Sequence, residues 1–374
     1  MSTLSAIQKL GAIKNYLSTK FVERDEIIYS LLIALLAKQH ILLIGLPGTA
    51  KSDLIGSLVK QILGANYFQL LFTKYTTPEE VFGPLSLKEL EQEKFIRRTE
   101  NFLPAAHLSF LDEIFKANSA ILNSLLNIIN ERVFYQNGQV VYTPLHSVIG
   151  ASNEYPENDE SLSALFDRFL IRHEVGYIAE DNNFLTMLRG VDVIAPEALT
   201  LAELVELQQQ VDSVKIADEI LHKILKIRKE LLDKEIAPSD RRFKKSLSLI
   251  KAAAVLDGRD QVTDSDLAVL ANVLWEDPKH QKDVGAILAP YTVDAIGGQL
   301  DKLSKQAKSV YEDAKAKSEI TVEETKEVNK KFKSIIEQLR NIESHNPTKK
   351  GRIDQMVTVI REWNNEIVNA SLGV

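Results

Sequence analysis

The hydrophobic pattern of the first 150 residues alternates between short apolar runs and longer amphipathic segments. A continuous apolar run predicts a buried strand over residues 41–44, and helical spacing of apolar residues predicts a helix over about 24–37. The same signals predict further strands over 67–72, 108–111 and 147–151, with helices over about 51–63 and 117–130. Strands that alternate with helices predict an α/β fold with a doubly wound, mostly parallel sheet.

A hairpin and two helical regions complete the predicted organisation. Two alternating runs flank Asn137-Gly138, the strongest short hairpin signal, and predict a hairpin over 133–142. Strand signals stop near 195, so we expect an α/β core over 1–194, an all-α domain over 195–275 and a helical region over 276–374. In the last region, apolar residues from Leu300 to Ala314 have helical spacing. Two or three helices forming a bundle, or packing on the N-terminal helix, are favoured over a coiled-coil partner site.

Composition narrows the class of protein. The 374 residues carry a formal net charge of −7 and include no cysteine. The charge argues against nucleic acid as the default partner, and the lack of cysteine excludes disulfides and thiolate metal sites. The apolar stretch 31–46 is interrupted by Lys38, Gln39 and His40, so we expect no membrane span. The first segment lacks the apolar run of a signal peptide, and we expect a cytoplasmic protein.

A phosphate-binding loop follows the first predicted strand and precedes a predicted helix. A glycine-rich turn lets backbone N–H groups point at phosphate oxygens, while a lysine contacts the β and γ phosphates and a hydroxyl binds Mg²⁺. An alanine stands where the strict pattern has its second glycine. The predicted ligands of ATP and Mg²⁺, with Ser52 as the metal ligand, lie in the run Gly45-Leu46-Pro47-Gly48-Thr49-Ala50-Lys51-Ser52.

Polar residues follow two later strands. Asp112 and Glu113 end the apolar strand 108–111, which fits a carboxylate that contacts Mg²⁺ and a carboxylate that polarises the attacking water. Asn153 follows the strand 147–151, at the edge where α/β sheets bind ligands. We expect Asn153 to orient the water or to contact the γ-phosphate.

These motifs give the chain a family resemblance. It resembles the AAA+ ATPases of the MoxR group, and most of all the RavA-type regulatory ATPases. The loop with alanine at position 50 is similar to the group's own form. The segments 111–117 and 152–154 are similar to its Walker B and sensor 1 regions, and 76–85 and 122–132 are longer diagnostic segments. The resemblance covers roughly residues 20–280.

The resemblance implies roles that spacing alone does not. Arg168 in Asp167-Arg168-Phe169 is similar to an arginine finger that reaches the γ-phosphate of a neighbouring subunit, with Arg172 as its nearest competitor. Arg241 is our choice over Arg242 for sensor 2, and Val22 lies where the family contacts adenine. The segment 84–103 resembles an insert in helix 2. That insert and the hairpin over 133–142 would both lie near the pore of a ring.

The resemblance implies Mg²⁺-dependent ATP hydrolysis in a ring oligomer, usually a hexamer, that remodels protein complexes. Its partners would be protein clients and a von Willebrand factor A-domain protein. A nucleic-acid motor, a metal-chelatase motor subunit and a non-enzymatic nucleotide sensor are the alternatives. The intact polar motifs argue against a non-enzymatic nucleotide sensor. The segments near the pore argue against a nucleic-acid motor, because their cations are only Lys88, Lys94, Arg97 and Arg98, among several acids.

Overall fold

The computed structural model describes residues 5–156, 160–292, 295–315, 322–345 and 350–372. They divide at residue 292 into two compact units, which are described separately below. Within the described ranges, no helix is both long and apolar enough to cross a bilayer.

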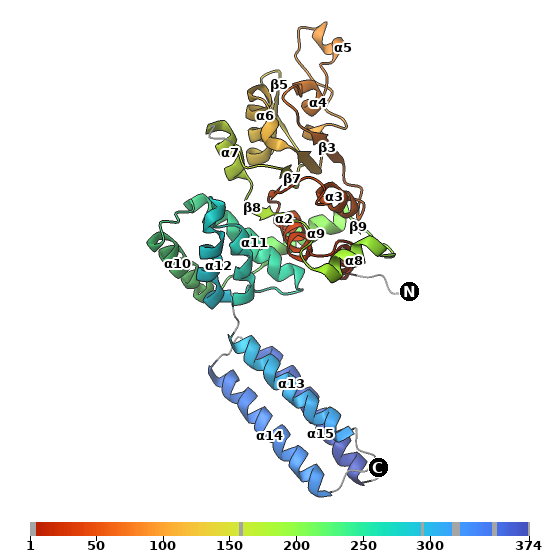
Figure 1. The fold of residues 1–374 in the computed structure, drawn as a ribbon, viewed down its shortest axis with the longest axis vertical. Coiled ribbons are helices and arrows are strands. Elements are labelled where there is room, and N and C mark those ends of the chain that lie inside the picture. Colours follow the sequence, from red (N-terminus) through yellow and green to blue (C-terminus); the bar gives the residue numbers. More distant parts are fainter. Residues whose placement is uncertain (1–4, 157–159, 293–294, 316–321, 346–349, 373–374) are drawn as a thin grey trace. The chain divides into compact units, whose positions relative to one another are not determined.

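A five-stranded parallel sheet forms the centre of the first unit (Figure 1). Parallel pairing runs without interruption across it, which confirms the predicted doubly wound α/β fold. Strand β8 gave no signal in the hydrophobic pattern because Arg172 and His173 interrupt it, yet the structure buries both side chains. In order across the sheet the strands are β3 (Tyr67–Leu71), β4 (Leu108–Asp112), β7 (Ser147–Ser152), β1 (Ile41–Ile44) and β8 (Ile171–Glu174).

Helices cover both faces of this sheet because successive strand residues point to opposite sides. In β1, Ile41 and Leu43 belong to one hydrophobic cluster, and Leu42 and Ile44 belong to the other. Helices α1 (Ala6–Lys20), α2 (Asp25–Leu36) and α3 (Lys51–Val59) contribute to the first cluster. Helices α4 (Pro78–Phe82), α6 (Ser119–Glu131) and α7 (Glu160–Arg168) contribute to the second.

The predicted hairpin is confirmed. Strands β5 (Val133–Gln136) and β6 (Gln139–Tyr142) pair antiparallel, and Asn137 and Gly138 both have positive φ, as a two-residue hairpin turn requires. The insert over 84–103 contains α5 (Leu87–Leu90) and an antiparallel bridge between Leu85 and Arg97, and η1 (Leu103–Ala105) follows. The Arg97 backbone N–H donates to Gln136 Oε1 at 2.6 Å, so the insert and the hairpin are in contact.

The all-helical part of the first unit packs on the α/β core rather than apart from it. Leu249 and Ile250 of α11 lie in the same cluster as Ile33 of α2. Val284 and Leu288 of α12 are buried in the same cluster, and the first compact unit continues to Thr292. Its helices are α9 (Leu201–Ser213), α10 (Asp218–Asp233), α11 (Asp240–Leu256), η3 (Asp264–Asn272), η4 (Pro278–His280) and α12 (Gln281–Thr292). Before them come α8 (Asp181–Arg189) and β9 (Leu199–Thr200), which pairs with β2 (Ile62–Leu63).

The second unit has a hydrophobic core of its own. Helices α13 (Ala295–Lys315), α14 (Val322–His345) and α15 (Lys350–Leu372) pack together, so the predicted helical bundle is confirmed. Leu300, Leu303 and Ala307 are buried as their spacing predicts. The rings of Tyr311 and Trp363 stack at a centroid distance of 4.9 Å across α13 and α15.

Candidate nucleotide-binding site

The loop between β1 and α3 has a backbone that only certain residues allow. A Cβ on Gly45 would lie 2.1 Å from the Val175 carbonyl oxygen, so the close approach of β8 requires glycine. Gly48 has φ of 77° and Ala50 has φ of 61°, both in the left-handed region. The alanine that departs from the strict loop pattern therefore adopts the conformation for which glycine is usually selected.

Lys51 lies at the centre of this loop. Its ammonium group donates to the carbonyl oxygens of Gly45 and Leu46 at 2.6 and 3.0 Å. It also lies 3.4 Å from Thr49 Oγ1 and 3.5 Å from Asn153 Oδ1. Burial lowers the pKa of Lys51, and the carboxylates of Asp112 and Glu113 oppose this shift. The loop lysine, the end of β4 and the end of β7 thus meet at one point, as the sequence predicts.

Glu113 is held from two sides. Its backbone is left-handed with φ of 51°, which ends β4, and its side chain is buried. Asn153 Nδ2 donates to Glu113 Oε1, and Lys116 Nζ lies 3.3 Å from Glu113 Oε2. A carboxylate fixed by an amide and an ammonium group is suited to orient one water molecule.

The residues predicted to bind Mg²⁺ fit that ion chemically. Asp112 is half-buried at the end of β4, and Ser52 is exposed in the first turn of α3. Mg²⁺ prefers a few protein oxygens together with phosphate and water. Among the described residues there is no cluster of three His, Cys, Asp or Glu side chains that would form an all-protein metal site. One hydroxyl and one carboxylate beside a phosphate loop therefore match a nucleotide-bound ion.

A pocket of about 280 Å³ adjoins the loop. Val22 and Phe21 line it from one side, and Gly48, Thr49 and Ala50 line it from the loop side. Its lining is mostly apolar, as expected of a site for a nucleotide base. The structure thus places Val22, predicted to contact adenine, next to the phosphate loop.

Lys20 and Arg24 also line this pocket, and its remaining wall comes from residues that sequence reasoning missed, namely Tyr177, Ile178, Phe184 and Met187. They lie on α8 and the segment before it, which carries no motif. The only available signal was the apolar spacing of Phe184 and Met187 along α8. Glu23 was missed as well. Its carboxylate accepts hydrogen bonds from Ala179 N, Glu180 N and Asn183 Nδ2 at 2.8 to 3.0 Å and attaches α8 to the core.

Of the four candidate arginines, two are fully buried and two are accessible to solvent at least in part. Arg172 and Arg242 are 1% and 2% exposed and bind backbone carbonyls. Arg168 is half-buried and pairs with Asp167 at 3.2 Å, and Arg241 is exposed and donates to Asn130 Oδ1 at 2.7 Å. Arg172, the competitor of Arg168, is therefore unable to reach a neighbouring molecule. Arg241, chosen over Arg242, is the accessible one of that pair.

Arg168 and Arg241 lie together although they come from different parts of the chain. Both line one small cavity, with Lys245 of α11. Burial, followed by the charges of Arg241, Arg132 and Arg168, lowers the pKa of Lys245 to about 8, while Asp167 opposes the shift. Cations that raise one another's electrostatic energy in this way are suited to bind an anion.

Two family models match the chain. A family model described as the MoxR domain in the MoxR-vWA-beta-propeller ternary systems matches residues 8–214. A model of an AAA lid domain matches residues 219–288, which include α11 and Arg241.

Similar proteins cover most of the chain. It is 36% identical to the uncharacterised protein MJ0079 of Methanocaldococcus jannaschii, over 96% of this chain and 97% of that protein. It is 27% identical to the chaperone MoxR1 of Mycobacterium tuberculosis, over 68% of this chain and 71% of MoxR1. A crystal structure of a protein from Cytophaga hutchinsonii has the same fold, with a TM-score of 0.62 and 18% identity, over 76% of this chain and 94% of that one.

Proposed function

Because the chain belongs to the MoxR family of AAA+ ATPases, we propose that it hydrolyses ATP at the site between the phosphate loop, β4 and β7. The observation that carries this proposal is the contact chain from Lys51 through Asn153 to Glu113. It joins the group that would bind the γ-phosphate to the group that would activate water.

Each residue of the proposed site has a separate role in binding or hydrolysis. The loop N–H groups and Lys51 bind the phosphate tail, and the α3 N-terminus adds a favourable dipole. Ser52 and Asp112 would hold Mg²⁺, which supplies positive charge against the developing negative charge on the phosphates. Glu113 accepts a proton from the water, and Asn153 keeps the Glu113 carboxylate in place. Phe21, Val22 and α8 enclose the base.

Hydrolysis would also need a neighbouring subunit. Arg168 and Arg241 face one cavity and would approach the γ-phosphate of the next subunit in a ring, which the family implies to be a hexamer. A cation supplied in this way stabilises transition-state charge and can accelerate hydrolysis by about 10³ to 10⁵. ATP turnover would then depend on assembly.

The work that hydrolysis drives would be the remodelling of protein complexes, as in RavA-type ATPases. The matched family model describes systems with a vWA protein, and MoxR1 is named a chaperone. We propose a vWA-domain protein as partner and protein clients as substrate. Co-purification with the ATP-loaded Glu113→Gln variant tests this, and loss of the partner in Lys51→Ala is the expected control result.

Two substitutions separate binding from hydrolysis. Lys51→Ala is expected to abolish nucleotide binding, measured with a fluorescent ATP analogue. Glu113→Gln is expected to retain binding and to lower phosphate release by at least about 100-fold, since it removes the general base. The matched control is Glu206→Gln on the exposed face of α9, which leaves both unchanged. Unchanged phosphate release in Glu113→Gln would overturn the proposed site.

A further inference from the structure

The last residues of α7 and the turn that leads to β8, residues 166–170, include Arg168 and are held by a buried arginine of α11. Arg242 Nη1 donates to Leu170 O at 2.9 Å and to Val273 O at 2.8 Å. Arg242 Nη2 lies 3.2 Å from both Asp167 O and Asp167 Oδ1. One guanidinium group therefore joins this turn of the α/β core to the segment 273–275 of the helical part.

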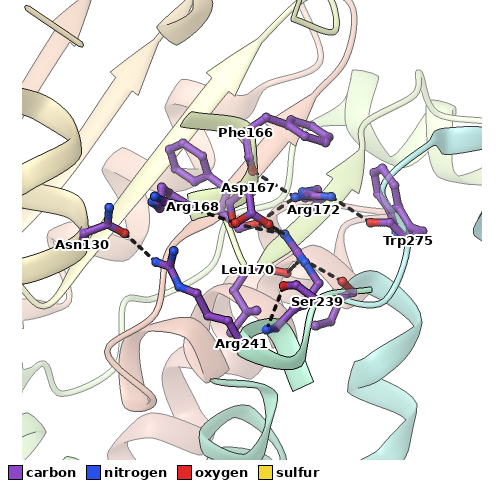
Figure 2. A network of polar contacts seen from close by, with 12 residues as sticks. Asn130, Phe166, Asp167, Arg168, Leu170, Arg172, Ser239, Arg241 and Trp275 are labelled. Carbon is purple, nitrogen blue, oxygen red and sulfur yellow. Dashed lines mark hydrogen bonds and ion pairs between the residues drawn. The ribbon is translucent and has the colours of Figure 1, made fainter. Parts of the chain in front are cut away.

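Arg172 makes the reciprocal connection from β8. It donates to Phe166 O at 3.0 Å and Phe169 O at 3.2 Å in the same turn, and to Trp275 O at 2.8 Å in the helical part. Its guanidinium carbon lies 3.8 Å from the centre of the Phe166 ring. In Figure 2, dashed lines connect the Arg172 guanidinium group to Phe166 and to Trp275.

The burial of two neighbouring arginines is energetically unfavourable, so packing alone does not account for it. Two cations lie buried close together, and burial, followed by the charge of Arg242, lowers the pKa of Arg172 to about 8. Asp167 is the acidic residue that contacts Arg242, and Arg172 binds carbonyls. Well-packed apolar residues can replace buried ions with little or no loss of stability, so such groups point to a requirement for defined geometry.

Asp167 connects Arg168 to the buried Arg242. Asp167 uses Oδ1 for Arg242 and Oδ2 for Arg168, each at 3.2 Å. Arg168 Nε is buried and has no hydrogen-bond partner among the described residues. Arg241 directly precedes Arg242 on α11 and is fixed at its other end by Asn130 of α6. The two accessible cations are thus attached to one buried framework.

We infer that Arg242 is a positioning residue that fixes Arg168 of the core and Arg241 of α11 as one pair, presented to the γ-phosphate of a neighbouring subunit. The inference rests on the proposed function, in which Arg168 acts on another subunit. Arg242 is buried and would act on the nucleotide only through Arg168 and Arg241. Any movement of α11 would displace Arg168 as well, because Asp167 links them.

Mixed assemblies test this role, because a subunit can donate its arginines or accept those of its neighbour. The donor carries Glu113→Gln, so it hydrolyses nothing itself, and the acceptor carries Arg168→Ala. ATP hydrolysis in the mixture then reports donor arginines acting on acceptor sites. This reference mixture tests the proposed function: no hydrolysis in it would refute the action of Arg168 between subunits, separately from the role of Arg242.

Arg242→Lys is then placed in either subunit. In the donor it is expected to lower the kcat of the mixture at least about tenfold with little change in the KM for ATP, since a displacement of 1 Å can cost about 100-fold. In the acceptor it is expected to leave the mixture as active as the reference. A residue needed only for folding would reduce activity equally in both positions, and that result would overturn the inference.

Two further variants keep the test decisive. Asp167→Asn keeps one acceptor oxygen for Arg242 but replaces the oxygen that holds Arg168 with an amide nitrogen, so it should fold and lower activity in the donor position only. Arg228→Gln is the matched control, because Arg228 is a partly exposed arginine of α10 that pairs with Asp240 at 3.5 Å. Full rescue by donors that carry Arg242→Lys or Asp167→Asn would also overturn the inference.

Discussion

Two residues of the candidate site, Ala50 and Glu113, hold backbone conformations that side chains rarely adopt, with φ of 61° and 51°. The left-handed conformation costs a residue with a Cβ roughly 1–2 kcal/mol. Such strain persists where the surrounding structure requires it, and it is common at functional sites. Here it turns the chain from β4 so that the Glu113 carboxylate meets Asn153. The sequence predicted these residues because motifs mark them, but it carried no sign of their conformation.

Lys245 provides a test of the cation cluster. Lys245→Met is expected to raise the melting temperature of the nucleotide-free protein at pH 7, because it removes a half-buried charge near Arg241, Arg132 and Arg168. The pKa of Lys245 is about 8, below its ordinary value of 10.5, so the folded state binds this proton less tightly than the unfolded state. The charge of Lys245 therefore destabilises the folded protein fully below pH 8, and this destabilisation disappears as the pH rises toward 10.5.

The measurement is thermal unfolding of the wild type and the variant between pH 7 and 10. The increase in melting temperature that Lys245→Met produces should become smaller as the pH rises over this range. Lys244→Met, at the exposed neighbouring position, should show no such trend. A difference from wild type that is independent of pH would contradict a lowered pKa for Lys245.

At the scale of elements, α8 is held over the pocket beside the phosphate loop mainly by polar contacts. None of its side chains is fully buried, and Phe184 and Met187 remain 47% and 45% exposed. Glu23 binds its N-terminal end, and Arg24 Nη2 donates to Gly176 O at 2.7 Å just before it. A helix with little buried area depends on such contacts for its position.

Glu23→Ala is therefore expected to weaken ATP binding about tenfold, since it removes three hydrogen bonds that fix one wall of the pocket. Titration with a fluorescent nucleotide measures this, and kcat should change less than KM. Glu26→Ala, an exposed carboxylate on the next helix, is the control. Equal nucleotide affinity in Glu23→Ala and wild type would refute this account of α8.

The same contacts make the attachment of α8 sensitive to acid. Hydrogen bonds from Ala179, Asn183 and Glu180 hold the pKa of Glu23 below its ordinary value of 4.5. A carboxylate with a lowered pKa stabilises the folded state at pH values above its ordinary pKa. This stabilisation is lost as the pH falls through the lowered pKa. Near neutral pH the Glu23 contacts are therefore intact.

Most elements of the α/β core were predictable because their apolar spacing reflects burial. Strand β1 and helix α2 follow the pattern within a residue or two. The pattern failed where polar side chains are buried, as in β8, because Arg172 and His173 obtain hydrogen-bond partners that only the tertiary structure supplies. It also gave no role to α8, because the contribution of that helix depends on Glu23, which is distant in sequence.

At the scale of the whole molecule, the proposed nucleotide site and the bundle α13–α15 belong to different compact units. The match to MJ0079 extends over 96% of the chain, so both units are shared with that relative. The family models match within residues 8–288 and leave the bundle outside. The sequence could predict the bundle from helical spacing, but it contains no motif that indicates a task for it.

In the proposed ring, arginines of a neighbouring subunit complete each active site. The most direct measurement is ATP hydrolysis at constant total protein while the fraction of Glu113→Gln subunits mixed with Arg168→Ala subunits is varied. Each variant alone is expected to be inactive, and the mixtures are expected to be active, with a maximum at an intermediate fraction. Hydrolysis that stays at the level of the separate variants at every fraction would contradict the account.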